Sequence, residues 1–429
     1  MPQCVAHQGV TSSVAFCNFK AMRVLVTGGA GYIGSHVVRA LRLHGHDVVV
    51  VDDLSTGHAT FAERNGVPLV EGDLGDASVL RRAFTEYGRI EAVVHIAGKA
   101  LAPESVRDPG PYFATNVTGP IRMLDSMRQF GVERIVFSST CAVYGTPPSL
   151  PIVETCPRNP ISPYGSSKLA FEFALEAYRA YGLRALPLRY FNVAGASEDG
   201  LFGELHDPET HLIPNLLKAA VQGSPFKLFG TDYPTRDGTA ERDYLHVEDL
   251  AQAHVLALER LDDLDFSAFP GALNLGTGRG VTVREMVAAT EAVTGRKVLV
   301  GEEPRRPGDP PALVADSRLA QDLLGWRAEH DLESMVGSAY RFHSQSGFEG
   351  GSMRIERRLK FGELAIMAGY VQDQAVQQAL KTQRERDGIG ESHKLLGLIL
   401  LEMGAISNEQ LIDTLRRMNE ASQRLKKVT

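Results

Sequence analysis

Between residues 22 and 190, apolar runs alternate with segments in which apolar residues recur at helical spacing. The clearest run, residues 48–51, consists of four consecutive valines. Continuous runs separated by helical crossovers are typical of a parallel sheet that helices cover on both faces. The pattern therefore predicts a doubly wound α/β fold. The predicted strands are 23–26, 48–51, 67–71, 92–96, 135–139 and 183–189, and the predicted helices are 35–43, 77–87, 112–131 and 169–181.

The pattern changes at about residue 191, where proline- and glycine-rich loops with short elements begin. This change predicts a smaller α/β domain that folds over the edge of the sheet and binds substrate. Small residues between positions 347 and 352 predict a flexible linker, because glycine and serine favour no ordered conformation. The predicted division is a disordered leader (1–21), a sheet domain (22–190), a substrate domain (191–346), a linker (347–353) and an all-α extension (354–429).

The first predicted strand runs into a glycine-rich turn, TGGAGYIG, at residues 27–34. Gly28 lets the chain reverse, Gly31 lets the backbone approach a pyrophosphate, and Gly34 lets the next helix pack closely on the strand. Free N–H groups at the start of that helix then face the phosphates. Asp52 ends the second strand, at the spacing expected of a carboxylate that binds the adenosine ribose. Together these features favour a Rossmann dinucleotide site over an ordinary turn.

A second group of polar residues follows the fifth predicted strand. Tyr164 and Lys168 are four residues apart, which places them on one helix face, and Thr140 ends the strand. A tyrosine that acts as a base near pH 7 needs a pKa shift of about three units, or roughly 4 kcal/mol. A cation about 4 Å away supplies on the order of 4 kcal/mol at an effective dielectric of 20. A surface Tyr–Lys pair has the same spacing, but the dinucleotide motif in the same sheet favours a catalytic pair.

The chain of 429 residues is 43% hydrophobic and 23% charged, with a net charge of −7. These values are typical of a soluble globular protein of two or three domains and predict no nucleic-acid surface. No apolar run approaches the ~20 residues of a membrane span, so no membrane association is expected. The four cysteines form no CxxC pair and no histidine cluster has metal-ligand spacing, which predicts reduced thiols, a cytoplasmic protein and no metal.

Several sequence motifs between residues 22 and 343 occur in the same order as in a known family. They are TGGAGYIGSH, VVHIAGKA, the Ser-Ser-Thr that precedes Tyr144-Gly145, SPYGSSK, LRYFNVAGA, FGTDYPTRDGTAERDYLHVEDLA and RRPGD. This stretch resembles the UDP-glucose 4-epimerases, which are extended short-chain dehydrogenases/reductases. The resemblance implies a cytoplasmic homodimeric isomerase that keeps NAD tightly bound and interconverts UDP-glucose and UDP-galactose.

The resemblance also implies roles for single residues. Tyr164 matches the base that takes the sugar 4-hydroxyl proton, Lys168 matches the lysine that binds the nicotinamide ribose and lowers the tyrosine pKa, and Thr140 matches a hydrogen-bond partner of the 4-oxygen. In that mechanism the C4 hydride passes to NAD, the 4-keto sugar turns about its diphosphate link, and hydride returns to the other face. The residues implied to hold NAD are Gly28, Gly31, Tyr32, Ile33, Gly34, Asp52, Asp53, Leu54, Asp73, Leu74, Ile96, Ala97, Gly98, Lys99, Asn116, Tyr164, Lys168 and Phe191.

Further matches concern the nucleotide sugar. Arg242 and Arg306 match residues that contact the sugar or the diphosphate, for which guanidinium groups are suited. His211 replaces a common Asn, either as a uridine contact or as a helix cap. Leu313 occupies a position that gates sugar size, which leaves the acceptance of N-acetyl sugars open. The implied substrate residues are Thr140, Tyr164, Asn192, His211, Leu212, Phe229, Arg242, Arg306, Asp309 and Leu313.

The residues that follow Thr140 distinguish this chain from a related class of enzymes. Nucleotide-sugar 4,6-dehydratases place Asp-Glu after the Ser-Thr pair for acid–base work at C5 and C6, whereas Cys141-Ala142 stand here. Three alternatives stay open: a net oxidoreductase that releases a keto sugar, a non-catalytic nucleotide sensor, and a 4-epimerase of UDP-GlcNAc, a UDP-pentose or UDP-glucuronate.

The extension contains an internal repeat with a period of 35 residues, marked by Gly362 and Gly397. Each unit predicts a short helix, a glycine turn and an amphipathic helix. The repeat resembles the small helical N-terminal domain of secretion and pilus-assembly ATPases, some of which bind cyclic di-GMP through an Arg-Leu-Gly start and a Gln end. The second copy starts Leu395-Leu396-Gly397 and lacks the basic residue. An interaction or dimerisation module with an unknown protein partner is therefore favoured over a cyclic di-GMP site.

Overall fold

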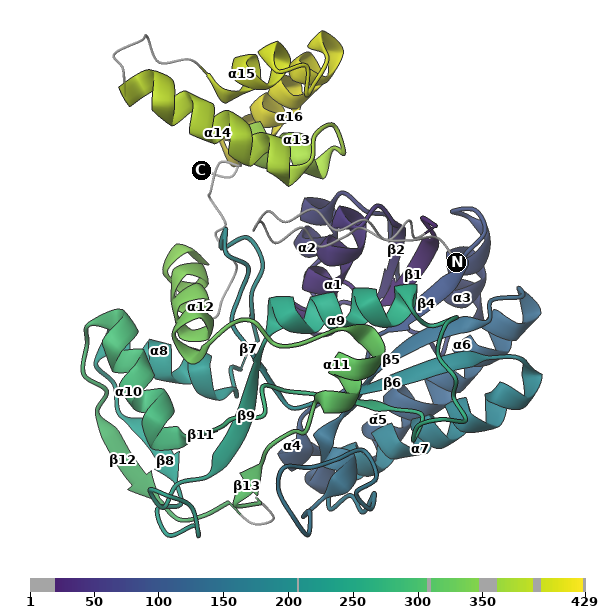
Figure 1. Cartoon of the computed structure of the whole chain (residues 1–429), viewed down its shortest axis with the longest axis vertical. Helices are drawn as coiled ribbons and strands as arrows, with labels where there is room; N and C mark the ends of the chain where they lie inside the picture. Colours follow the sequence, from purple (N-terminus) through teal and green to yellow (C-terminus); the bar gives the residue numbers. More distant parts are fainter. Residues whose placement is uncertain (1–19, 207, 307–309, 347–360, 389–394, 427–429) are drawn as a thin grey trace, which may run out of the picture.

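The computed structural model describes residues 20–206, 208–306, 310–346, 361–388 and 395–426. At its centre lies a seven-stranded sheet in the order β10-β6-β5-β4-β1-β2-β3, and every adjacent pair is parallel (Figure 1). The strand order runs outward from β1 in both directions, which confirms the doubly wound fold. The strands are β1 (Arg23–Thr27), β2 (Asp47–Asp52), β3 (Leu69–Glu71), β4 (Ala92–His95), β5 (Arg134–Thr140), β6 (Arg184–Tyr190) and β10 (Leu273–Leu275).

The seventh strand, β10, was not predicted. It has only three residues, too few for a visible apolar run, and its Leu273 pairs with Leu188 of β6. Helix α9 (Val247–Glu259) packs on the same sheet and also follows residue 190. A division at residue 190 therefore separates the sheet from a strand and a helix that complete it.

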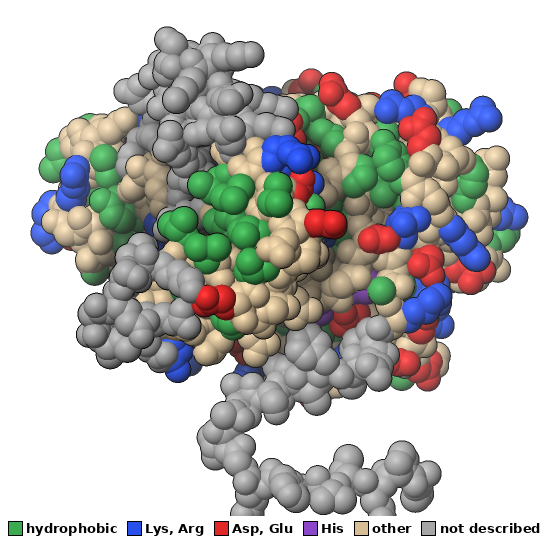
Figure 2. All heavy atoms as spheres, turned by 90° about the horizontal axis from the view of Figure 1, so that it is seen from above, with side chains coloured by type: hydrophobic (Ala, Val, Ile, Leu, Met, Phe, Trp, Pro, Cys, Tyr) green, Lys and Arg blue, Asp and Glu red, His purple; other side chains and the backbone are tan. Residues whose placement is uncertain are grey.

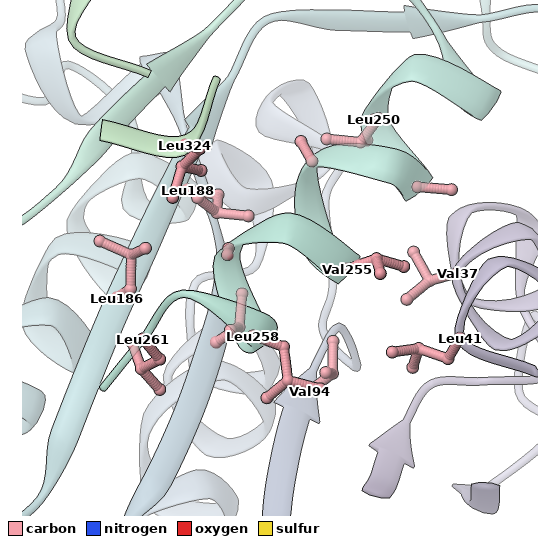
Figure 3. Close-up of a cluster of buried hydrophobic side chains, with 14 of the residues drawn as sticks. Val37, Leu41, Val94, Leu186, Leu188, Leu250, Val255, Leu258, Leu261 and Leu324 are labelled. Carbon is pink, nitrogen blue, oxygen red and sulfur yellow. The ribbon is translucent and has the colours of Figure 1, made fainter. Parts of the chain in front are cut away.

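Helices cover both faces of the sheet, and each face has its own apolar cluster. Val24 and Val26 of β1 point into one cluster and Leu25 points into the other, as the alternation of a strand requires. Val37 and Leu41 on α1 and Val255 and Leu258 on α9 belong to the first cluster (Figure 3). The covering helices are α1 (Tyr32–Leu43), α9 and α11 (Arg318–Leu324) on the first face, and α3 (Ala77–Thr85), α6 (Gly119–Gln129) and α7 (Pro163–Tyr178) on the second.

Two predicted helices differ from the structure. The helix predicted over 112–131 is interrupted, because a π-helical turn, η1 (Ala114–Thr118), separates α5 (Gly110–Phe113) from α6. Helix α7 begins six residues before the predicted 169, since Ser162 caps it by accepting a hydrogen bond from the Gly165 N–H at 3.2 Å. The remaining short helices of this region are α2 (Ala59–Asn65), α4 (Ala102–Arg107), η2 (Cys141–Tyr144) and η3 (Arg179–Tyr181).

The predicted smaller α/β region is present. β9 lies at the centre of its larger sheet and pairs with β7, β11 and β13, while β8 and β12 form a separate pair. Three helices pack around these strands in one apolar cluster that includes Leu216, Met286 and Val336. The elements are β7 (Asn192–Ala194), α8 (Leu212–Gln222), β8 (Phe226–Phe229), β9 (Glu241–His246), β11 (Gly280–Thr282), α10 (Val283–Thr294), β12 (Val300–Glu303), β13 (Ala312–Leu313) and α12 (Leu332–Ser346).

The extension is all-helical, as predicted. Each repeat is a helix pair, and residues of both pairs share one apolar cluster. Gly362 and Gly397 lie where the repeats meet: an added Cβ would come within 3.1 Å of the Leu396 side chain at the first and 2.8 Å of the Phe361 ring at the second. Glycine at both positions therefore permits the close contact. The helices are α13 (Phe361–Met367), α14 (Asp373–Gly388), α15 (Leu396–Glu402) and α16 (Asn408–Lys426).

None of the helices described is both long and apolar enough to cross a membrane. On the face that Figure 2 shows, acidic and basic side chains of the described residues are interspersed. The leader up to residue 19, residues 347–360 around the predicted linker, and Asp309 lie outside the described residues.

Candidate active site

The glycine turn has the geometry that its sequence predicts. Gly28 has φ +72°, and a Cβ there would lie 2.6 Å from the Ala97 nitrogen, so a larger residue would be excluded. A Cβ on Gly34 would overlap the carbonyl oxygen of Gly28. Gly31 differs, because the one atom near an added Cβ is that same oxygen at 3.3 Å. Gly31 also precedes α1 without a side-chain cap, so the first N–H groups of the helix can face an anion.

Asp52 ends β2 beside this turn, and its carboxylate is held from two sides. One oxygen accepts a hydrogen bond from the Ala30 N–H and the other accepts one from the Leu54 N–H, both at 2.9 Å. Burial nevertheless raises the pKa of Asp52. Leu54 has φ +58°, a conformation uncommon for a side chain of its size and typical of functional loops. The carboxylate is thus fixed at the carboxyl end of the sheet, where a ribose hydroxyl would be bound.

Asn116 holds the loop after β4 against α7. Its side chain accepts a hydrogen bond from the Lys99 N–H and donates to the Lys99 carbonyl and to Ser167 Oγ, at 2.9, 3.0 and 2.9 Å. Asn116 lies in the π-helical turn, a distortion frequent at functional sites. A Cβ on Gly98 would lie 2.8 Å from Asn116 Oδ1 and 3.0 Å from Lys168 Nζ. The predicted residues Gly98, Lys99, Asn116 and Lys168 therefore meet in one place.

Tyr164 and Thr140 are neighbours. Burial, and then the nearby Tyr190, raise the Tyr164 pKa well above its usual value, and the Thr140 side chain lowers it only in part. The Thr140 side chain also accepts a hydrogen bond from the Ala142 N–H at 3.2 Å. In the chain alone, burial prevails over every lowering influence, so Tyr164 needs further positive charge to act as a base near pH 7.

Lys168 is buried on the same helix, one turn after Tyr164. Its ammonium donates to the Ser138 carbonyl at 3.0 Å and lies 5.0 Å from the centre of the Phe137 ring. Burial lowers its pKa to about 8. Among the described residues the Ser138 carbonyl is its one hydrogen-bond partner, which leaves two N–H donors for a ligand.

The predicted substrate residues, such as Arg242, Phe229, Arg306 and Leu313, form what we call the sugar side of the site, and the predicted NAD residues form the NAD side. Arg242 of β9 lies opposite Leu313 of β13 in the strand register. Its guanidinium donates to the Glu241 carbonyl at 2.8 Å, and its charge acts on Cys141, the residue after Thr140. Burial raises the pKa of Cys141 to about 12, so the thiol cannot supply the acid–base work of a dehydratase. Arg242 and Leu313 are therefore close to the catalytic residues.

The outer part of this side is more exposed. The guanidinium of Arg306 lies 4.1 Å from the centre of the Phe229 ring, which brings two predicted substrate residues together. Asn192 is exposed at the start of β7. Phe191, by contrast, is buried in a cluster with Leu313.

The other predicted NAD residues lie at the same edge of the sheet. Tyr32 and Ile33 open α1, and the Tyr32 hydroxyl donates to the Gly195 carbonyl at 2.6 Å. The N–H groups of Ile96 and Ala97 both donate to the Thr27 carbonyl, which fixes the loop after β4 beside the turn. The exposed carboxylates of Asp53 and Asp73 accept bonds from Ser55 and Gly75, and Leu74 is buried.

Several residues at the site were not predicted. Ser105 Oγ accepts a hydrogen bond from the Tyr164 N–H at 3.1 Å, and Ser167 Oγ donates to the Tyr164 carbonyl at 2.8 Å. The rings of Tyr112 and Tyr164 are 6.5 Å apart. Each of these contacts joins segments that are distant in sequence or depends on side-chain direction. Of these residues, Ser167 could have been noticed in the sequence, because it lies within the SPYGSSK segment and directly precedes Lys168.

His211 differs from one of its two predicted roles, the helix cap, and its role as a uridine contact stays a prediction. It stands at the N-cap position of α8, yet its side chain makes no capping hydrogen bond. Its Nδ1 instead lies 2.8 Å from Glu204 Oε1 and 3.1 Å from Glu209 Oε1. His206 joins the same group, although the sequence indicated no cluster with metal-ligand spacing.

These residues fit a dinucleotide. The turn at Gly28–Gly34 leaves backbone N–H groups for phosphates, Asp52 can bind a ribose, and Lys168 keeps free donors in a buried position. A Tyr–Lys pair on one helix beside such a turn defines an oxidoreductase-type site of the short-chain dehydrogenase/reductase class.

Comparison with known proteins agrees with this class. Residues 24–276 match the NAD dependent epimerase/dehydratase family. The chain is 46% identical over 325 residues to the UDP-glucose 4-epimerase of Lacticaseibacillus casei, which covers 75% of this chain and 97% of that protein. The chain therefore belongs to the NAD dependent epimerase/dehydratase family, in the group of its UDP-glucose 4-epimerases.

Two solved structures show the same fold. The UDP-glucose 4-epimerase of Brucella ovis in complex with NAD is 46% identical, with a TM-score of 0.70 over 75% of this chain and 98% of that one. The enzyme of Stenotrophomonas maltophila with bound NAD and formylated UDP-arabinopyranose is 41% identical, with a TM-score of 0.71 and the same coverage. The matched share leaves the helical extension outside the comparison.

Proposed function

We propose that the chain interconverts UDP-glucose and UDP-galactose by inverting the configuration at C4 of the hexose. The observation that carries this proposal is the placement of Tyr164 and the buried Lys168 one turn apart on α7, where Lys168 donates to the Ser138 carbonyl at 3.0 Å. The family is NAD-dependent, and when bound, NAD supplies a reversible hydride acceptor and a positive charge.

The chain's own residues have distinct roles in the proposal. Tyr164 takes the proton of the sugar 4-hydroxyl, and Thr140 holds the 4-oxygen by a hydrogen bond. Lys168 binds the nicotinamide ribose through its remaining donors and favours the charged form of Tyr164. Arg242 and Arg306 bind the diphosphate, and Asn192, Phe229 and Leu313 line the sugar and uridine sites. The roles of Leu212 and Asp309 stay predictions.

The choice of glucose and galactose rests on the relatives. The curated relative with 46% identity acts as a UDP-glucose 4-epimerase, whereas the Stenotrophomonas structure holds a UDP-pentose derivative. A 4-epimerase of another UDP-sugar is therefore the second candidate. A homodimer, a partner for the extension and a cytoplasmic location stay predictions, and a cyclic di-GMP site stays the less favoured alternative for the extension.

One experiment separates the candidate functions. Purified protein is assayed with UDP-galactose and no added cofactor, and a second sample is denatured and searched for released NAD. Released NAD together with turnover supports the proposal. Stoichiometric accumulation of NADH would identify a net oxidoreductase, and NAD without turnover on any UDP-sugar would identify a sensor.

A further inference from the structure

Four side chains of the segment before α8 converge on one small volume. His211 Nδ1 lies 2.8 Å from Glu204 Oε1 and 3.1 Å from Glu209 Oε1. His206 Nδ1 lies 3.4 Å from Glu204 Oε1 and 4.0 Å from Glu209 Oε2. One ligand atom from each of the four residues lies within 4.8 Å of the other three. Two imidazoles and two carboxylates thus share a small volume.

The cluster places two carboxylates in contact with two imidazoles. Glu204 is buried, and burial alone would oppose its ionisation, but the charge of His211 with His206 beside it lowers the Glu204 pKa to about 2. Burial likewise opposes the charged form of His211, yet Glu204 and Glu209 raise its pKa to about 10. The cluster therefore combines two carboxylate oxygens with two imidazole nitrogens, which are ligand types that zinc takes.

His206 gives a second, independent indication. Its Nδ1 is buried and has no hydrogen-bond partner among the described residues. A buried ring nitrogen without a hydrogen bond costs free energy, and Glu204 Oε1, although 3.4 Å away, makes no hydrogen bond to it. The nitrogen is directed at the two carboxylates, and a neutral imidazole in that position can donate its lone pair to a metal.

We propose that Glu204, His206, Glu209 and His211 bind one zinc ion. Zinc takes imidazole nitrogens and carboxylate oxygens at about 2.0–2.2 Å in a four-coordinate arrangement, which a small contraction of this cluster provides. Two carboxylates neutralise the charge of the ion once His211 has lost its proton. No water position is needed to complete four ligands, so the site is structural.

The position of the cluster shows what the ion would stabilise. His211 precedes α8, and the Leu205 carbonyl between two of the ligands lies 3.2 Å from Nε2 of His58, which precedes α2. Burial is the largest cause that raises the pKa of Tyr32 in the glycine turn, and the charges of Glu204 and Glu209 raise it further. An ion here would fasten the segment between the sugar side and the NAD side.

The test uses the full chain after treatment with a chelator, with zinc chloride as the probe in titration calorimetry. Two buffers of different ionisation enthalpy measure proton release. We expect one zinc ion per chain with release of a proton, and a higher melting temperature with zinc. His206→Ala should weaken zinc binding by at least roughly tenfold. Removing a residue that only hydrogen-bonds to a metal ligand already costs about that much, and His206 would be a ligand itself.

The variants keep the proposal falsifiable. His206 is partly exposed, so its truncation should leave the fold intact, and circular dichroism checks this. Glu209→Gln gives a second variant that keeps side-chain volume. His44→Ala and His330→Ala are controls, since each removes a histidine paired with a carboxylate elsewhere. Failure of the wild-type protein to bind zinc, equal binding by folded His206→Ala and Glu209→Gln, or loss of binding in either control would overturn the proposal. None of these results affects the proposed epimerase activity.

Discussion

The NAD side and the sugar side of the site are built in different ways. Asp52, Asn116 and Lys168 are buried at the ends of the long parallel sheet, and each is held by hydrogen bonds to backbone groups. Arg242 and Leu313 come from strands of six and two residues, and Arg306 is exposed beside residues 307–309. In the proposed function the cofactor would therefore be positioned by a rigid scaffold, whereas the sugar would be positioned by short elements that can vary without changing the fold.

The largest loss of turnover is expected from a change at Tyr164, which we place between the NAD side and the sugar side. Tyr164→Phe removes the proton acceptor and little volume, so turnover should fall about 10²- to 10⁴-fold while NAD stays bound. The measurements are kcat with UDP-galactose and the NAD content of the purified variant. Tyr178→Phe is a matched control on the same helix, because its hydroxyl donates to the exposed Asp125, and its activity should be unchanged. Near wild-type turnover of Tyr164→Phe would show that another group is the base.

Lys168→Met tests the NAD side. The variant loses a positive charge one helical turn from Tyr164, and an opposite charge within about 4–6 Å shifts a pKa by about 1–3 units. A base acts once it is deprotonated, so the rise of kcat with pH should move to more alkaline pH by a similar amount. NAD content should also fall, because the ribose donors are lost. Lys297→Met, an exposed lysine paired with Glu291, is the control. An unchanged pH profile would contradict the electrostatic role.

Arg242→Met tests the sugar side. A charge-assisted hydrogen bond contributes about 1.5–3 kcal/mol, so KM for UDP-galactose should rise roughly 10- to 100-fold. NAD content should not change, because the NAD side is held separately. Arg284→Met, which breaks an exposed pair with Glu302 in the same region, should leave KM as it is. If Arg242→Met loses NAD instead, the two sides are not independent.

The smallest change in turnover is expected from removal of the helical extension, which contains none of the predicted site residues. A chain that ends at Ser346 keeps every predicted site residue, and the repeats of the extension bury their apolar faces against each other. Turnover, NAD content and folding should therefore match the full chain. Calorimetry with cyclic di-GMP on the full chain tests the less favoured alternative for the extension, and no tight binding is expected. Loss of NAD on truncation would make the extension part of the core, and tight nucleotide binding would show that the degenerate second repeat is competent.

The same contrast explains what the sequence could predict. Gly28, Gly34 and the Tyr164–Lys168 pair depend on spacing within one turn or helix, so local pattern sufficed. Six strands were predicted because each is a continuous apolar run, whereas β10 has three residues and completes the sheet only through pairing with β6. The group around His211 was missed because its residues follow no helical or strand period. Their convergence depends on the loop conformation, which the sequence does not reveal.

The most direct test of the account follows the hydrogen at C4. UDP-galactose that carries deuterium at C4 is converted to equilibrium without added cofactor, and the isotope in the UDP-glucose formed is measured by mass spectrometry and NMR. We expect deuterium to stay at C4 with inverted configuration, because the carbon–hydrogen bond is broken and remade within one site. Replacement of deuterium by solvent hydrogen would contradict it, since inversion would then proceed by proton removal from carbon.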